Sequence, residues 1–177
     1  MIPLIRCAQD ESPLSYEFTV EDVSPKAISL IPILRSGLSM LEAVQSLLPW
    51  PVSVHHLGMY RDKSTLQAVE YYNNLPQHQH KAGSEDNLMD LAIIIDPIIA
   101  TGSTVCAAID TLRDWGVPRI ICLAVLCSEN GLRRAAELWP EGVEIWAAGC
   151  DKETDERGMI KPGLGDIGDR LFLTMGK

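Results

Sequence analysis

The sequence predicts a single α/β domain with a central, mainly parallel β-sheet, helices on both faces of the sheet, and a small hood. Two observations carry this prediction. Apolar runs rich in β-branched residues, such as LAIII at residues 91–95, lack polar alternation, which is typical of strands buried on both faces of a parallel sheet. Segments with apolar residues at helical spacing follow several of these runs. This alternation of strand and helix indicates βαβ units.

Composition limits the class of protein. A chain of 177 residues is long enough for one domain with a substantial core. Its formal net charge of −9 argues against a nucleic-acid partner bound through a broad basic surface. No apolar run approaches membrane-spanning length, and the first residues lack the basic and apolar regions of a signal peptide. We therefore expect a cytoplasmic protein with no nucleic-acid or membrane partner.

The cysteines and histidines do not predict a metal site or a disulfide framework. The five cysteines form no CxxC pair, and Cys106, Cys122 and Cys127 lie within apolar or helical patterns. We expect these three to be small buried side chains in a reducing compartment. The four histidines occur in two pairs without zinc-site spacing, so we expect solvated side chains.

The first part of the chain contains one clear strand-turn-helix unit. Residues 1–26 are weakly patterned and contain three prolines, which predicts an irregular lead-in or a short edge element. Residues 27–34 (AISLIPIL) predict a buried strand, and residues 38–48 predict a helix. Arg35 lies in the turn between them. Its forked guanidinium suits phosphate, although an arginine that caps a surface loop would produce the same pattern.

A shorter strand, a hairpin and a loop are expected next. Residues 52–59 predict the strand, and residues 60–76 mix charged and aromatic side chains without a clean period. We interpret residues 60–76 as a hairpin or mobile flap with Arg61 near its base. Residues 77–90 are polar and predict an exposed loop, so that 60–80 form a flap and loop segment.

The stretch around Asp96 predicts an anion site. The apolar strand at residues 91–95 ends on Asp96, and the small-residue loop 100–104 (ATGST) then leads into a helix that begins near Ser103 or Thr104. Free N–H groups and the positive end of the helix dipole would face the loop, and Gly102 would let a phosphate approach the backbone. An ordinary strand-to-helix turn with a capping hydroxyl is the alternative.

Two further strands and one helix complete the predicted sheet. Residues 119–127 and 143–148 predict strands, and residues 132–139 predict a short amphipathic helix between them. The tail at residues 158–172 is dense in glycine and aspartate. Its glycines permit sharp turns that expose backbone groups to a small planar ligand, although a turn-rich C-terminus without a ligand remains the alternative. These glycines are Gly163, Gly165 and Gly168.

Four motifs together resemble the uracil phosphoribosyltransferase family. The resemblance extends from about residue 28 to the end, and the loop motif combined with the C-terminal motif is highly specific. A single acid at the end of the strand, with Ile95 before Asp96, is similar to the uracil enzymes. The motifs are PILRSGLSM (32–40), GMYRDKSTLQAVEYYNNLP (58–76), IIIDPIIATGST (93–104) and KPGLGDIGDRLF (161–172).

The resemblance implies an enzyme of pyrimidine salvage, a pentosyltransferase. It would transfer a phosphoribosyl group from phosphoribosyl pyrophosphate to N1 of uracil, with Mg²⁺ assisting, to form UMP and pyrophosphate. A homodimer is also implied. No protein ligand of the metal is assigned directly, because Mg²⁺ would be bound through the substrate, with Asp166 near it.

The resemblance also implies roles for individual residues. The catalytic set would be Arg35, Arg61, Asp96 and Asp166, with the arginines on pyrophosphate and Asp96 on the ribose hydroxyls. Ile160 and the backbone of residues 165–167 would frame uracil in a base-binding loop at residues 158–172. The residues implied for phosphoribosyl pyrophosphate are Arg35, Arg61, Asp96, Pro97, Ile98, Ile99, Ala100, Thr101, Gly102, Ser103, Thr104 and Asp166; those implied for uracil are Ile160, Gly165, Asp166 and Ile167.

Departures from the family pattern cluster at the base end. Ile167 replaces a usual alanine, Met159 a usual tyrosine, and Lys161 an apolar residue. The helical segment that usually precedes the first core strand is not evident in residues 1–26. Two alternatives therefore stand beside the active uracil enzyme. One is a catalytically weak protein that senses phosphoribosyl pyrophosphate or a nucleotide, and the other is a phosphoribosyltransferase with altered base specificity.

Overall fold

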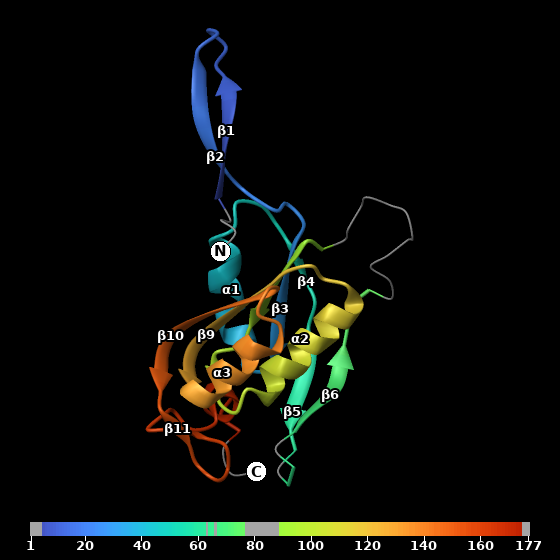
Figure 1. The fold of residues 1–177 in the computed structure, drawn as a ribbon, viewed down its shortest axis with the longest axis vertical. Helices are drawn as coiled ribbons and strands as arrows, with labels where there is room; N and C mark the ends of the chain where they lie inside the picture. Colours follow the sequence, from blue (N-terminus) through green and yellow to red (C-terminus); the bar gives the residue numbers. More distant parts are fainter. Residues whose placement is uncertain (1–4, 63, 66, 77–88, 175–177) are drawn as a thin grey trace.

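The computed structural model describes residues 5–62, 64–65, 67–76 and 89–174 (Figure 1). Its centre is an eight-stranded mixed sheet in which most neighbouring strands are parallel, which confirms the predicted α/β class. The main path of the sheet is β10-β9-β7-β3-β5-β6, with β4 paired to β3 and β8 paired to β9. The elements are β1 (Ile5–Glu11), β2 (Glu17–Val23), β3 (Ile28–Leu34), α1 (Leu38–Ser46), β4 (Ser53–Val54), β5 (Leu57–Arg61), β6 (Ala68–Asn73), β7 (Leu91–Ile95), β8 (Ile98–Ile99), α2 (Ser103–Trp115), β9 (Ile120–Ser128), α3 (Glu129–Leu138), β10 (Val143–Asp151), β11 (Glu153–Thr154), β12 (Ile160–Lys161) and α4 (Ile167–Leu171).

Strands β3, β7 and β9 form the buried centre of the sheet, as the apolar runs predicted. All five residues of β7 are buried, and β7 pairs in parallel with β3 on one side and β9 on the other. Ile28 lies opposite Leu91, and Ile95 lies opposite Leu123. Because both faces of these strands are covered, their sequences need no polar alternation.

Helices cover both faces of the sheet, which confirms the prediction. Successive side chains of a strand point to opposite faces. Leu30 belongs to the cluster packed against α1, whereas its neighbour Ile31 belongs to the cluster that includes α2 residues such as Ile109 and Leu112. Helix α3 adds Ala135 to that second cluster. The chain therefore folds around two apolar layers, one on each side of the sheet.

The segment at residues 52–76 differs in detail from the prediction. The single strand predicted at 52–59 is two short strands, β4 and β5, each parallel to β3. The hairpin predicted at 60–76 is confirmed, because β5 and β6 pair antiparallel. Arg61 lies opposite Ala68 at the turn end of this hairpin rather than at its base. The exposed loop predicted at 77–90 lies mostly outside the described residues.

The described residues 5–26 do not form the irregular lead-in or the short edge element that was predicted for residues 1–26. Strands β1 and β2 pair antiparallel from Ile5–Val23 to Glu11–Glu17 and form a separate two-stranded sheet. Figure 1 shows this hairpin extending away from the domain. Most of β2 is exposed, so the hairpin has no buried face that would impose an alternating apolar pattern on its sequence.

The C-terminal part has longer elements than predicted. Helix α3 begins at Glu129, three residues before the expected start, because the Ser128 side chain caps it. Strand β10 continues to Asp151 instead of stopping at residue 148. Gly168 lies within α4, so it is not one of the positive-φ turn glycines, unlike Gly163 and Gly165.

None of the helices in the described part of the chain is long and apolar enough to cross a membrane.

Candidate active site

A cavity of about 590 Å³ lies where β3 and β7 end. The carboxyl ends of parallel strands are the usual binding edge of an open α/β sheet. Most of the site residues predicted from the sequence line this cavity, although they come from separate motifs. These are Arg35, Asp96, Ile98, Ile99, Ala100, Thr101, Gly102, Thr104, Ile160, Gly165, Asp166 and Ile167.

Two predicted site residues, Pro97 and Ser103, are not among the residues that line the cavity. The carbonyl oxygen of Pro97 accepts hydrogen bonds of 3.0 Å from the backbone N–H groups of Val125 and Leu126, so Pro97 fixes the chain after β7. Ser103 is buried, and its hydroxyl lies 2.6 Å from that of Thr101. The side chain of Arg61 lies outside the described part of the structure, so its predicted role stays a prediction.

Asp96 is a buried carboxylate at the edge of the cavity. Its exposed fraction is 6%. Ser36 Oγ donates a hydrogen bond of 3.1 Å to Oδ1 of Asp96. Burial raises the pKa of Asp96 to about 7, because loss of solvation outweighs the opposite effects of the hydrogen bonds from Ser36 and the Ile98 backbone. Asp96 is therefore suited to accept hydrogen bonds from neutral donors, such as the hydroxyls of a sugar.

The loop before α2 is built to bring backbone N–H groups to the cavity. Gly102 is the N-cap of α2 with φ +77° and has no side chain to cap the helix, while Thr101 Oγ1 accepts a hydrogen bond of 3.4 Å from the Ser103 N–H. A Cβ atom at Gly102 would lie 2.8 Å from the carbonyl oxygen of Gly131 and would also be strained by the positive φ. The first N–H groups of a helix lack partners within the helix, and they attract anions. The loop and α2 together fit a phosphate group.

Ser128 and Gly131 support this loop from behind. The fully buried Ser128 hydroxyl donates to the carbonyl oxygen of Ala100 over 2.6 Å and accepts from the N–H of Gly131 over 2.9 Å. A Cβ atom at Gly131 would lie only 2.2 Å from that same carbonyl oxygen. The sequence analysis missed both residues, although a serine between an apolar strand and an acidic residue is a recognisable N-cap signal.

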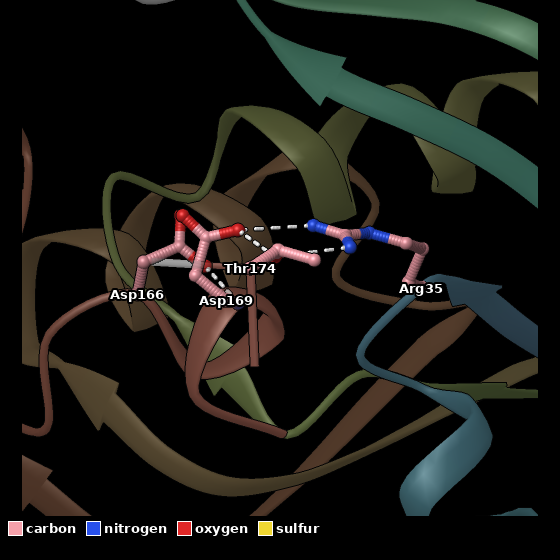
Figure 2. Close-up of polar contacts among 4 residues, drawn as sticks. All are labelled: Arg35, Asp166, Asp169 and Thr174. Atoms are coloured by element: carbon pink, nitrogen blue, oxygen red, sulfur yellow. Dashed lines mark hydrogen bonds and ion pairs between the residues drawn. The ribbon is translucent and has the colours of Figure 1, made fainter. Parts of the chain in front are cut away.

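Arg35 follows β3 and is bound by the C-terminal segment (Figure 2). Its Nη2 lies 3.1 Å from Oδ1 of Asp169, and its Nη1 donates to Thr174 Oγ1 over 3.3 Å. The guanidinium carbon lies 5.5 Å from the ring centroid of Phe172. Asp166 Oδ1 in turn accepts a hydrogen bond of 3.0 Å from the Asp169 backbone N–H. The arginine and the acidic tail, separate in sequence, therefore meet at the cavity.

Part of the lining is apolar or aromatic. The tail contributes Ile160 and Ile167, together with Met159, and the β5–β6 hairpin contributes Tyr60 and Tyr71. Gly163 and Gly165 have positive φ, as the predicted sharp turns require. A planar, uncharged ring fits such a surface better than an anion does. The cavity thus combines polar groups, such as Arg35 and Asp96, with an apolar surface that includes Ile167.

The side chains of the described residues do not include a group of three or more His, Cys, Asp or Glu that could hold a metal ion. Three carboxylates nevertheless line the cavity, those of Asp96, Glu156 and Asp166. Magnesium is commonly held in proteins by one or two carboxylates together with substrate phosphates and water. This donor set fits a magnesium ion that arrives with a phosphorylated substrate.

An open α/β sheet that gathers an arginine, a carboxylate and a helix N-terminus at its strand ends defines a class of proteins that bind phosphorylated sugars or nucleotides. Comparison with known families identifies the family within that class to which the chain belongs. The family model for uracil phosphoribosyltransferase matches residues 2–174, and the chain belongs to this family of pentosyltransferases.

Curated relatives and solved structures agree with this assignment. Proteins named uracil phosphoribosyltransferase from Roseiflexus castenholzii and Listeria innocua are 44% and 39% identical to the chain over 83% and 94% of its length. The chain spans 66% and 74% of those relatives. A solved structure from Aquifex aeolicus has 30% identity and a TM-score of 0.79, covering 98% of this chain and 78% of that one. A hypoxanthine phosphoribosyltransferase from Staphylococcus aureus shares the fold, with 13% identity, a TM-score of 0.51, and coverage of 77% of this chain and 72% of its own.

Proposed function

We propose that the protein is an active uracil phosphoribosyltransferase that forms UMP and pyrophosphate from uracil and phosphoribosyl pyrophosphate in pyrimidine salvage. The observation that supports this most is a common cavity lined by four groups from three sequence-distant segments. Arg35 carries positive charge, Asp96 a buried carboxyl, the 100–104 loop a set of backbone donors, and the tail an apolar wall. Each matches one part of the two substrates.

In this reaction the bond between ribose C1′ and the pyrophosphate oxygen breaks, and a bond from C1′ to uracil N1 forms. The electron pair of the broken bond leaves on pyrophosphate, and the proton of N1 is released to pyrophosphate or solvent. Positive charge develops on the ribose while negative charge accumulates on the leaving group. Fixed donors aimed at that negative charge lower the barrier, which is the role we assign to Arg35.

The phosphate and ribose of the substrate have separate binding groups in this proposal. The 5′-phosphate binds the N–H groups of the loop at 100–104 and the start of α2. Asp96 accepts hydrogen bonds from the ribose hydroxyls, which orients C1′ toward the base. Magnesium, when bound with phosphoribosyl pyrophosphate, neutralises part of the charge of the leaving group. Asp166 is the cavity carboxylate that we assign to the metal and the pyrophosphate.

Uracil recognition is assigned to the tail. The backbone groups at Gly165 would meet the polar edge of the base, because a base with the wrong donor or acceptor would leave a buried partner unpaired. Ile160 and Ile167 would contact the ring faces. The presence of Ile167 and Met159 in the lining also favours the second candidate, a phosphoribosyltransferase with another base, because both differ from the family pattern and Ile167 adds bulk where alanine is usual.

The test is formation of UMP by purified protein supplied with uracil, magnesium and phosphoribosyl pyrophosphate. We expect UMP from the wild type and a loss of about 100-fold or more in Asp96→Asn, which replaces one of the two acceptor oxygens with an NH2 donor and removes the negative charge while keeping the size of the side chain. A panel of other bases under the same conditions tests the second candidate. No product from any base, together with saturable binding of phosphoribosyl pyrophosphate, would contradict both enzymes and favour the sensor.

Two further properties belong to the same proposal. We propose a homodimer on family membership, and sedimentation velocity of the purified protein tests it. We also propose a cytoplasmic location, supported by three free buried cysteines, Cys106, Cys122 and Cys127, which suit a reducing compartment. Fractionation of the source cells tests that location.

A further inference from the structure

We propose that Asp169, assisted by Thr174, is a positioning residue that fixes the guanidinium of Arg35 for the pyrophosphate of phosphoribosyl pyrophosphate. This inference rests on the proposed function of the cavity. It goes beyond that function because it assigns a role to the end of the chain, outside the residues that would touch the substrate.

The first step is the geometry of the contacts around Arg35. Asp169 Oδ1 and Thr174 Oγ1 receive Nη2 and Nη1 over 3.1 and 3.3 Å. Thr174 Oγ1 donates to the same Asp169 oxygen over 2.6 Å, so the two acceptors are held together. Phe172 lies against the guanidinium, 5.5 Å from ring centroid to carbon. Three side chains thus fix the rotation as well as the position of the planar group.

The second step is that Asp169 is itself held in place. It lies in the first turn of α4, where its backbone N–H donates to Asp166 Oδ1 over 3.0 Å. The Thr174 N–H donates to the Asp169 carbonyl oxygen over 3.0 Å. Helix α4 lies directly beside the guanidinium, because a Cβ atom built at Gly168 would be in ordinary van der Waals contact with Arg35 Nη2, at 3.9 Å. A carboxylate that other contacts hold in place can orient an arginine, whereas a mobile carboxylate would move together with the arginine side chain.

The third step separates positioning from stability. The side chains of Arg35 and Asp169 are 48% and 34% exposed. Ion pairs with this exposure contribute little to the free energy of unfolding. Among the described residues, the contacts with Asp169 and Thr174 engage two of the five N–H donors of the guanidinium, and the cation remains at the cavity wall. The contacts of Arg35 with Asp169 and Thr174 therefore affect the geometry of the cavity more than the stability of the fold.

A competing role for Asp169 would be that of a counter-ion that substrate must displace. The two roles predict opposite effects. If Asp169 positions Arg35, removing the carboxylate weakens the use of phosphoribosyl pyrophosphate. If Asp169 blocks Arg35, removing it strengthens binding and lowers the KM for that substrate.

The experiment compares wild type, Asp169→Ala, Arg35→Ala and the double variant by kcat and KM for both substrates. We expect Asp169→Ala to lower kcat/KM for phosphoribosyl pyrophosphate about tenfold while the KM for uracil stays within about twofold. In the double variant we expect kcat/KM for phosphoribosyl pyrophosphate to be the same as in Arg35→Ala, because Asp169 affects the substrate only by orienting Arg35. Thr174→Val should lower kcat/KM for phosphoribosyl pyrophosphate by less than Asp169→Ala does. Thr174→Ser, which keeps the hydroxyl, should have the kcat/KM of the wild type.

A lower KM for phosphoribosyl pyrophosphate in Asp169→Ala, or additive losses in the double variant, would overturn the proposal. Unchanged melting temperatures across the set would show that folding does not cause the effects. If the wild type makes no UMP, the proposed function fails, and calorimetric binding of phosphoribosyl pyrophosphate to the same four proteins decides the role of Asp169 by the same comparison. A wild type that neither reacts nor binds would overturn both proposals.

Discussion

Ser36 Oγ donates a hydrogen bond of 3.1 Å to Oδ1 of Asp96, and this contact joins the turn after β3 to the end of β7. The two strands are adjacent and parallel, so the residues that follow them emerge side by side. The hydrogen bond from the Ser36 hydroxyl compensates only in part for the solvation that the Asp96 carboxyl group loses on burial, because Asp96 is 6% exposed. The pKa of Asp96 accordingly rises to about 7 through burial, in spite of this hydrogen bond.

The first prediction concerns the pH dependence of stability. Because the folded-state pKa of about 7 exceeds the ordinary value of 3.8, the folded chain binds this proton more tightly than the unfolded chain does. The contribution of Asp96 to stability is therefore complete below pH 3.8 and is lost as pH rises through about 7. We expect Asp96→Asn to be more stable than the wild type at pH 8, on the order of 2–4 kcal/mol, with the difference vanishing near pH 4.

Urea unfolding of both proteins at a series of pH values between 4 and 8 measures this difference. Asp10→Asn is the matched control, because Asp10 lies exposed on β1 and the same chemical change there should leave the pH profile unaltered. Parallel profiles for Asp96→Asn and wild type would contradict the assigned pKa.

The second prediction concerns Gly131. Alanine at this position would bring a Cβ atom to 2.2 Å from the Ala100 carbonyl oxygen, and both partners belong to backbone that cannot rotate away. We expect Gly131→Ala to lower the free energy of unfolding by about 2–4 kcal/mol and to lower UMP formation through displacement of the phosphate loop. Gly149→Ala is the matched control, since its Cβ would lie 3.5 Å from the nearest side-chain atom, and it should be nearly neutral. Equal melting temperatures for the two variants would be evidence against close packing of the loop on α3.

The third prediction concerns Ser128. Ser128→Ala removes the cap of α3 and leaves the Ala100 carbonyl oxygen without its hydroxyl donor. We expect a loss of about 2–3 kcal/mol in the free energy of unfolding, the sum of a lost cap and a lost buried hydrogen bond. Thermal and urea unfolding measure it. Ser46→Ala provides the comparison, because the exposed Ser46 hydroxyl only bonds the Ala43 carbonyl within α1 and its loss should cost little. A similar small cost at Ser128 would show that the cap is dispensable.

The parts of the fold that were predictable from sequence are those in which burial determines the residue types. The apolar runs at β3, β7 and β9 have no polar alternation, because both faces of each strand are covered, and all three were recognised. The β1–β2 hairpin was missed because most of β2 is exposed and therefore carries no pattern. The start of α3 was missed because its first turn is polar and depends on a cap from Ser128.

The candidate site was predictable where a local motif defines it. Asp96 at a strand end and the glycine loop before α2 are adjacent in sequence, so their joint position follows from one strand-loop-helix unit. The contact of Arg35 with Asp169 joins residues 134 positions apart and depends on where α4 docks. No local pattern encodes such a distance. The same holds for Ser128 and Gly131, whose importance is visible only once α3 lies behind the loop.

The seating of the Ala100–Gly102 backbone on Gly131 has a thermodynamic consequence for binding. Hydrogen bonding to Ser128 and direct backbone contact hold the loop in one conformation before any ligand arrives. A phosphate group that binds there needs to immobilise few backbone torsions, so little conformational entropy is lost on association. The free energy of its hydrogen bonds is then available for affinity and orientation instead of for ordering the protein.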